Sequence, residues 1–185
     1  NDGFVLPMAL PLQTLLRVRP RDDRRVVLHA ANFDERHEFD LDRIAPQENW
    51  IDYVQGVARE LARAGVPLRG LEGVVTSDVP LAAGLSSSAS IEVAAALALL
   101  HAAEYSLPET EIALLCQRAE NEFVGVSCGI MDQMAVAACR AGHALLLDCR
   151  SLKIEQVPLR LHDYAIVVTD SAAPRQLAGS AYNER

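Results

Sequence analysis

A bend rich in glycine and serine leads directly into an apolar helix, and this junction constrains the fold more than any other stretch of the chain. Residues 80–90 read PLAAGLSSSAS, and the run IEVAAALALL follows at 91–100. Small and apolar residues on every side predict a helix that is buried all round. The hydroxyl side chains at its beginning exceed what capping needs, because one cap residue satisfies only one or two free amides. We therefore expect something else to meet this helix end.

The remaining sequence predicts strands before this junction and helices after it. Alternating apolar and polar residues predict strands at 3–18 (interrupted by Pro7 and Pro11), 24–32, 36–41 and 68–80. Helical spacing predicts helices at 47–64, 87–103, 108–124 and 128–140. Gly65 marks the end of the first of these helices, and Pro108 marks the start of the third. A hairpin is predicted at 143–149 and 153–159, and one more strand at 163–171. This order indicates an α+β fold rather than a doubly wound sheet.

The composition excludes several classes of partner. The 185 residues are 50% hydrophobic and 23% charged, which is typical of a globular chain with one domain and part of another. A net charge of −8 disfavours nucleic acid and anionic membranes, because counterion release needs a basic stripe. The four cysteines form no C-x-x-C pair, and the longest apolar run is too short to span a bilayer. We expect a cytoplasmic protein that binds neither nucleic acid nor a membrane.

Two interpretations of the serine-rich bend remain open from the residues alone. A glycine turn directs backbone amides inward, and the following helix offers free N–H groups and the positive end of its dipole, which together suit an anion. The absence of lysine from the bend excludes the G-x-x-x-x-G-K-[ST] phosphate loop. The alternative is a serine-rich cap on a core helix, in which the small residues serve packing only.

Several separate motifs, in the same order along nearly the whole chain, resemble one family. The bend resembles the P-x-x-x-G-L-x-S-S-A loop of the GHMP small-molecule kinases. Within that superfamily, segments matching the galactokinase family are GFVLPMAL (3–10), NWIDYVQG (49–56), AENEFVG (119–125), GIMDQ (129–133) and GHALLLDCRSL (142–152). The resemblance implies an N-terminal domain like the second domain of ribosomal protein S5, at 1–160. The start of a ferredoxin-like C-terminal domain is then implied at 161–185.

The resemblance implies phosphoryl transfer, which needs anion stabilisation, a metal and a placed hydroxyl nucleophile. The implied ATP-binding residues of the loop are Gly84, Leu85, Ser86, Ser87 and Ser88. Ser88 and Glu120 are implied ligands of Mg²⁺. Without the family, Glu120 is better interpreted as a solvated helix carboxylate beside Glu122.

The family also implies residues for the sugar and the base. Asp132 is the implied catalytic aspartate, which accepts the proton of the sugar hydroxyl; its alternative role is a favourable charge at a helix N-terminus. Its sequence neighbours are mostly apolar, so we expect an apolar setting. Gly129 and Tyr182 are implied sugar contacts, although a lone tyrosine more often serves packing. Trp50 resembles an adenine-stacking residue, and its alternative is a place in the core.

The activity implied is ATP-dependent phosphorylation of D-galactose at its anomeric hydroxyl, by a monomer. Related sugars, N-acetylgalactosamine or arabinose, are alternatives. A non-catalytic galactose and ATP sensor is another, but such sensors lose the serine–alanine pair that Ser88 and Ala89 form here. The third alternative is a domain that has only a structural role.

Several family features lie outside the sequence or differ in it. The G-E-H-T-D-Y-N signature would end at Asn1, and TDSAAPRQL (169–177) departs from the family stretch, with Arg175 displaced by one position. We therefore expect a polypeptide cut at both ends that has an incomplete sugar pocket and little activity alone.

Overall fold

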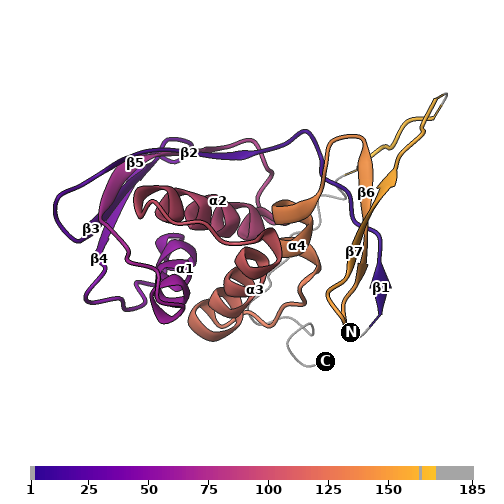
Figure 1. The fold of residues 1–185 in the computed structure, drawn as a ribbon. Coiled ribbons are helices and arrows are strands. Elements are labelled where there is room, and N and C mark those ends of the chain that lie inside the picture. The colour runs from indigo at the N-terminus through magenta and orange to yellow at the C-terminus, as the bar shows by residue number, and fades with distance from the viewer. Residues whose placement is uncertain (1–2, 163, 170–185) are drawn as a thin grey trace.

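Four of the alternating segments form a sheet in the computed structural model, which describes residues 3–162 and 164–169 (Figure 1). Its strands are β2 (Thr14–Pro20), β3 (Arg25–Ala30), β4 (Glu35–Asp40) and β5 (Leu71–Ser77). The order is β2-β5-β3-β4, with β3 and β5 parallel and the other pairs antiparallel. Alternation sends one set of side chains inward, including Leu28, Phe39 and Leu71, and leaves most of the opposite face exposed, although Val27 on that face is buried. The strand predictions for this half are confirmed.

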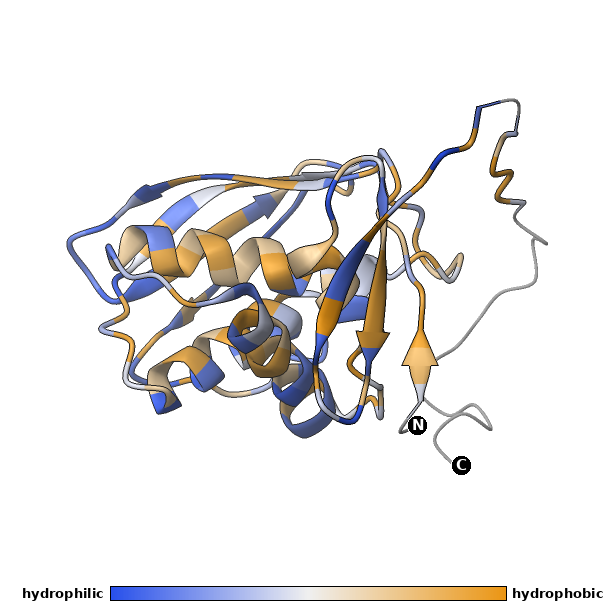
Figure 2. Cartoon of the chain, turned by 45° about the vertical axis from the view of Figure 1, so that its right-hand side comes forward, coloured by the Kyte–Doolittle hydropathy of each residue, from blue (hydrophilic) through white to orange (hydrophobic). Residues whose placement is uncertain are grey.

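The inner face of this sheet is covered by helices, as Figure 1 shows. These are α1 (Ile51–Arg63), α2 (Ser87–Ala102), α3 (Glu109–Ala119), a π-helical turn η1 (Glu120–Val124) and α4 (Met131–Ala138). The helix α2 lies between the sheet and the other helices and is apolar along most of its length (Figure 2). Its predicted burial is confirmed at most positions; the exposed ones are Leu97, at 54%, and His101 in the last turn.

A second sheet lies beside α4 and is built from both ends of the described chain. Its strands are β1 (Phe4–Val5), β6 (His143–Asp148) and β7 (Ile154–Pro158), in the order β1-β6-β7. Both pairs are antiparallel, so the predicted hairpin is confirmed. Leu145 and Leu147 pack with Met134 of α4 in a separate apolar cluster. This cluster anchors the helix that carries Asp132.

Some predicted boundaries were wrong, for identifiable reasons. The first helix begins at Ile51 rather than at Gln47, because Asn49 Oδ1 accepts the Ile51 amide while Asp52 accepts the amides of residues 47 and 48 outside the helix. The helix predicted at 108–124 is α-helical only to Ala119. The strand predicted at 163–171 is absent over 164–169. Apolar side chains in this segment are exposed, and its backbone pairs with no strand of the described chain.

Across residues 3–162 and 164–169, no helix combines the length and the apolar character needed to cross a membrane.

Candidate phosphate and carboxylate site

The bend before α2 holds backbone amides free at the helix N-terminus. Gly84 has φ 75° and Ser86 has φ 59° and ψ 41°, so both adopt the left-handed conformation. The helical hydrogen bonds begin with the Ser90 amide, which donates to the Ser86 carbonyl oxygen at 3.0 Å. A left-handed residue followed by a helical one directs successive amides to the same side, which forms a concave site for an anion. The bend therefore has the backbone of an anion site.

The serine side chains support the anion interpretation over the capping one. No side chain caps α2, although Ser86 occupies the N-cap position. Ser90, one turn further, is engaged within the fold, since its hydroxyl donates to Thr14 Oγ1 at 2.8 Å. In the described part of the chain, the hydroxyls of Ser86, Ser87 and Ser88 have no such side-chain partner. These serines therefore do not cap α2 through their side chains, and their hydroxyls are half-buried at the bend.

A buried cluster of two carboxylates and one amide lies next to the first turns of α2. Glu92 is 0% exposed and Glu120 is 2% exposed. The Gln133 side-chain amide donates to both, with Nε2 at 3.1 Å from Glu92 Oε2 and at 2.6 Å from Glu120 Oε2. The Cys128 thiol also donates to Glu120 Oε2, at 3.2 Å. The interpretation of Glu120 as a solvated carboxylate is therefore wrong, whereas Glu122 is exposed and pairs with Arg63.

Burial and mutual repulsion raise several pKa values around this cluster. Burial raises the pKa of Glu92 to about 9, and the charge of Glu120 adds to this rise, against a smaller opposing effect of the Gln133 hydrogen bond. Burial, with Glu120 next in size, also raises the pKa of Tyr53 to about 12. The same two causes raise the pKa of the Cys128 thiol, so this thiol is protonated at neutral pH.

Two amide side chains, those of Asn121 and Gln117, hold the loop between η1 and α4. Asn121 Oδ1 accepts the Cys128 amide at 2.7 Å, and Asn121 Nδ2 donates to the Cys128 carbonyl oxygen at 3.3 Å. Gln117 Nε2 donates to the same carbonyl at 3.2 Å. These bonds hold the Cys128 thiol against Glu120, at the first residue of a π-helical turn, a feature that often marks functional sites.

Asp132 lies in the first turn of α4, next in sequence to Gln133. It is half-buried, and its charge is close enough to contribute to the raised pKa of Glu92. Of the apolar residues near it in sequence, Ile130 and Met134 are buried in an apolar cluster, whereas Met131 and Val136 are 40% and 39% exposed. Since α2 and α4 are in contact, the start of the serine-rich helix and the half-buried carboxylate lie on neighbouring elements.

The other predicted site residues are less tightly connected. A side chain at Gly129 would meet nothing within 4 Å, so this glycine borders open space. Trp50 stands edge-on to His37 with ring centroids 5.5 Å apart, packs against the main core, and has an Nε1 without a partner in the described chain. Tyr182 and Arg175 lie outside the described residues.

Sequence reasoning missed three members of the cluster, namely Glu92, Gln133 and Cys128. The one available signal was a glutamate inside a run of apolar residues, because a buried charge on a core helix needs a partner. Within the described chain no three acidic, histidine or cysteine side chains form a group suited to hold a metal by themselves.

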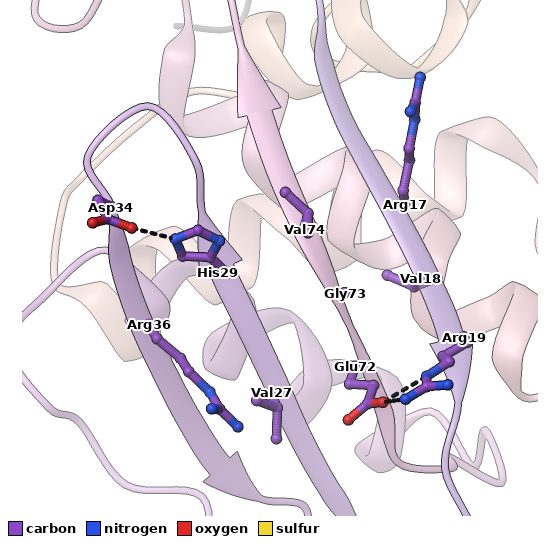
Figure 3. Close-up of a pocket in the computed structure, with 10 residues that line it drawn as sticks. All are labelled: Arg17, Val18, Arg19, Val27, His29, Asp34, Arg36, Glu72, Gly73 and Val74. Atoms are coloured by element: carbon purple, nitrogen blue, oxygen red, sulfur yellow. Dashed lines mark hydrogen bonds and ion pairs between the residues drawn. The ribbon is translucent and has the colours of Figure 1, made fainter.

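A separate hollow of about 770 Å³ lies on the outer face of the four-stranded sheet (Figure 3). His29 Nε2 lies 2.9 Å from Asp34 Oδ1 at one side of it, and Arg19 Nε donates to Glu72 Oε1 at 2.5 Å at another. The hollow faces away from the helices, so it is distinct from the cluster around Gln133.

Comparisons with known proteins agree on one family. Residues 52–140 match the family model described as "GHMP kinases N terminal domain". A protein of Chloroflexus aggregans (strain MD-66 / DSM 9485) named "Galactokinase" is 47% identical over 187 residues, which cover 100% of this chain and 48% of that protein. A "Galactokinase" of Roseiflexus sp. (strain RS-1) is likewise 47% identical over 186 residues and is covered to 47%. The chain therefore spans about half the length of these relatives.

Solved structures give the same result for the fold. The crystal structure of Lactococcus lactis galactokinase complexed with galactose matches with a TM-score of 0.95 at 38% identity, covering 100% of this chain and 49% of that one. The mevalonate kinase of Methanococcus jannaschii matches with a TM-score of 0.70 at 19% identity, covering 88% of this chain and 51% of that one, which shows a shared fold alone.

Proposed function

We propose that this chain is part of a GHMP kinase of the galactokinase type, and that the whole protein phosphorylates D-galactose with ATP; the family model over residues 52–140 and the similarity to galactokinases along the whole chain support the proposal. The reaction gives galactose 1-phosphate and ADP. The observation that carries the proposal is the contact between α2, whose N-terminus has free amides and hydroxyls, and α4, whose first turn carries Asp132. Phosphoryl transfer needs an anion site and a proton acceptor that are close together.

The bend is the proposed site of the ATP phosphates. Amides from Gly84 to Ser88, including Leu85, and the hydroxyls of Ser86, Ser87 and Ser88 supply donors to phosphate oxygens, and the helix dipole favours their charge. These donors are fixed before the nucleotide arrives. They therefore stabilise the charge that develops on the phosphoryl oxygens without reorganising during the reaction.

Asp132 is the proposed proton acceptor. The anomeric hydroxyl of galactose attacks the γ-phosphorus, a new O–P bond forms, and the bond to the bridging oxygen of the β-phosphate breaks, so that ADP leaves with that electron pair. The hydroxyl proton goes to the Asp132 carboxylate, which is half-buried and thus accessible to a substrate. Gly129 lies three residues earlier and borders open space, and its backbone is the proposed contact to the sugar. Tyr182 is a further proposed sugar contact.

Mg²⁺ fits the residues present. It keeps several waters and typically binds one or two protein carboxylates together with substrate phosphates, so a group of three protein ligands is not required. The proposed ligands are Glu120, a carboxylate, and Ser88, a hydroxyl with no side-chain partner in the described chain. When bound, the ion would neutralise charge on the β- and γ-phosphates. Trp50, with its unpaired Nε1, stays the proposed adenine contact.

The domain boundaries and the cellular compartment of the protein are also proposals. We assign residues 1–160 to the N-terminal kinase domain and 161–185 to the start of the C-terminal one. The four cysteines are free thiols, which supports a reducing compartment such as the cytoplasm.

A panel of sugars presented to the intact protein with ATP and Mg²⁺ tests the assignment. ADP formation is measured with galactose, N-acetylgalactosamine and arabinose, and the highest kcat/KM is expected with galactose. Ser88→Ala is expected to raise the Mg²⁺ concentration needed for half-maximal rate. Ser106→Ala, at an exposed position, is the matched control that leaves it unchanged. Binding of galactose and ATP without turnover would instead support the sensor alternative.

A further inference from the structure

Gln133 is the one side chain in the described structure that links the three helical elements α2, η1 and α4. It is 0% exposed, and its Nε2 reaches Glu92 on α2, Glu120 on η1 and, at 3.7 Å, the Cys128 sulfur. An amide nitrogen has two hydrogens to donate, and the two carboxyl groups accept one each. The geometry at this nitrogen is therefore fully determined by its partners.

Gln133 is the one hydrogen-bond donor to Glu92 in the described chain, whereas Glu120 also accepts a bond from the Cys128 thiol. Both glutamates are buried, and a buried carboxyl that loses its hydrogen bond keeps the full cost of desolvation. Glu92 is the more dependent of the two, since its other oxygen, Oε1, is buried with no partner in the described chain. Gln133 is thus held in one position by strong constraints on both sides.

This fixed position determines how the proposed reacting groups face each other. Asp132 precedes Gln133 on a helix of only eight residues, so anchoring Gln133 sets the rotation of the first turn of α4 and the direction of the Asp132 side chain. On the other side, Ser88 lies one turn before Glu92, about 6 Å along the axis of α2. The same amide therefore fixes the phosphate-binding end of α2 and the base-bearing end of α4.

From these contacts we infer that Gln133 is a positioning residue for phosphoryl transfer, which holds Asp132 in register with the phosphate-binding bend through its bridge to Glu92 and Glu120. The expected effect on kcat rests on the proposed function. The bridge that couples α2 to α4 does not depend on that function. Misplacement of a reacting group by about 1 Å costs on the order of 100-fold in rate. Loss of the bridge is therefore expected to lower kcat with little change in substrate binding.

The test compares two pairs of variants in the intact protein. Gln133→Met keeps the volume but removes the amide, and is expected to lower kcat about 100-fold while the KM values for ATP and sugar change by less than about 3-fold. Glu92→Met removes one acceptor of the bridge and carries the same expectation if Gln133→Met does not fold. Glu92→Gln retains an acceptor oxygen for Gln133, so its kcat is expected to stay within about 3-fold of wild type.

A buried glutamine outside the cluster controls for loss of packing. Gln55 on α1 is also 0% exposed and its Nε2 donates to Asp52 Oδ1 at 3.0 Å. Gln55→Met is expected to lower the melting temperature as Gln133→Met does, but to leave kcat within about 3-fold of wild type. An equal loss of kcat in both variants, or normal kcat in folded Gln133→Met and Glu92→Met, overturns the positioning role.

Hydrogen exchange separates failure of this inference from failure of the kinase assignment. Exchange of the first hydrogen-bonded amides of the two helices, residues 90–94 of α2 and 134–138 of α4, is expected to rise at least about tenfold together in Gln133→Met and to stay unchanged in Gln55→Met. If the wild-type protein turns over no sugar but this coupled rise is found, the kinase assignment fails and the bridge between α2 and α4 stands. If exchange rises in neither helix, the bridge itself is refuted.

Discussion

Glu92 gives the sharpest prediction about stability, because a buried carboxyl with a raised pKa makes folding depend on pH. Its ordinary pKa is 4.5, and burial with the nearby Glu120 raises it to about 9 in the folded protein. Between these values the native state holds a proton that the unfolded state has released, so stability falls as the pH rises through this window. One proton corresponds to about 1.4 kcal/mol for each pH unit, which gives a cost of about 3 kcal/mol at pH 7.

Glu92→Gln is expected to remove this cost while preserving the bridge. The glutamine side chain is neutral at every pH, has nearly the same shape, and keeps an oxygen for the Gln133 amide. The variant is therefore expected to exceed the wild type in free energy of unfolding by up to about 3 kcal/mol at pH 7, and to match it near pH 4.5.

Urea unfolding of the ligand-free protein at pH 5, 6, 7 and 8 measures this difference. The gap between variant and wild type is expected to widen by about 1.4 kcal/mol for each pH unit from pH 5 to pH 8. Glu122→Gln, at an exposed carboxylate paired with Arg63, is the control and is expected to show no such widening. A gap that is constant with pH would refute the reasoning, since it would mean that Glu92 does not take up a proton on folding.

Three further predictions concern the bend, the sheet and the base. Ser86→Val is expected to destabilise the fold by about 1–2 kcal/mol in urea unfolding, because a β-branched residue is strained at φ 59°, whereas Ser86→Gly is expected to cost much less; equal costs would contradict this. Gly73→Ala would place a Cβ 2.1 Å from the Arg17 carbonyl oxygen and is expected to lower the melting temperature strongly, unlike Gly129→Ala, which meets nothing within 4 Å. Asp132→Asn is expected to lower kcat by about 100-fold to 10,000-fold with ATP affinity retained by calorimetry, and an undiminished kcat would exclude the assigned proton acceptor.

Local patterns predicted most of the fold because its elements follow local physical rules. The alternation in 24–32 and 36–41 and the left-handed Gly65 after α1 appear in the structure as expected. The strand predicted at 163–171 shows where such rules end. A β-rich segment needs a partner for its backbone groups, and over 164–169 Val167 remains 82% exposed with no neighbouring strand in the described chain.

The candidate site was only partly predictable for a related reason. The bend and Asp132 belong to contiguous motifs, so their residue types indicate their chemistry. The bridge joins residues 92, 120 and 133, whose separations in sequence carry no helical or strand period, and only the packing of α2 against α4 brings them together. Glu120 illustrates the consequence: its sequence neighbours indicate a solvated carboxylate, whereas tertiary packing leaves it 2% exposed.

A crystal structure of the intact protein with Mg²⁺, a non-hydrolysable ATP analogue and galactose tests the central claim most directly. We expect β- and γ-phosphate oxygens within hydrogen-bond distance of the amides of residues 86–88, and the anomeric hydroxyl within hydrogen-bond distance of Asp132. Phosphates bound elsewhere on the molecule, or a sugar hydroxyl directed away from Asp132 with the bend empty, would contradict it.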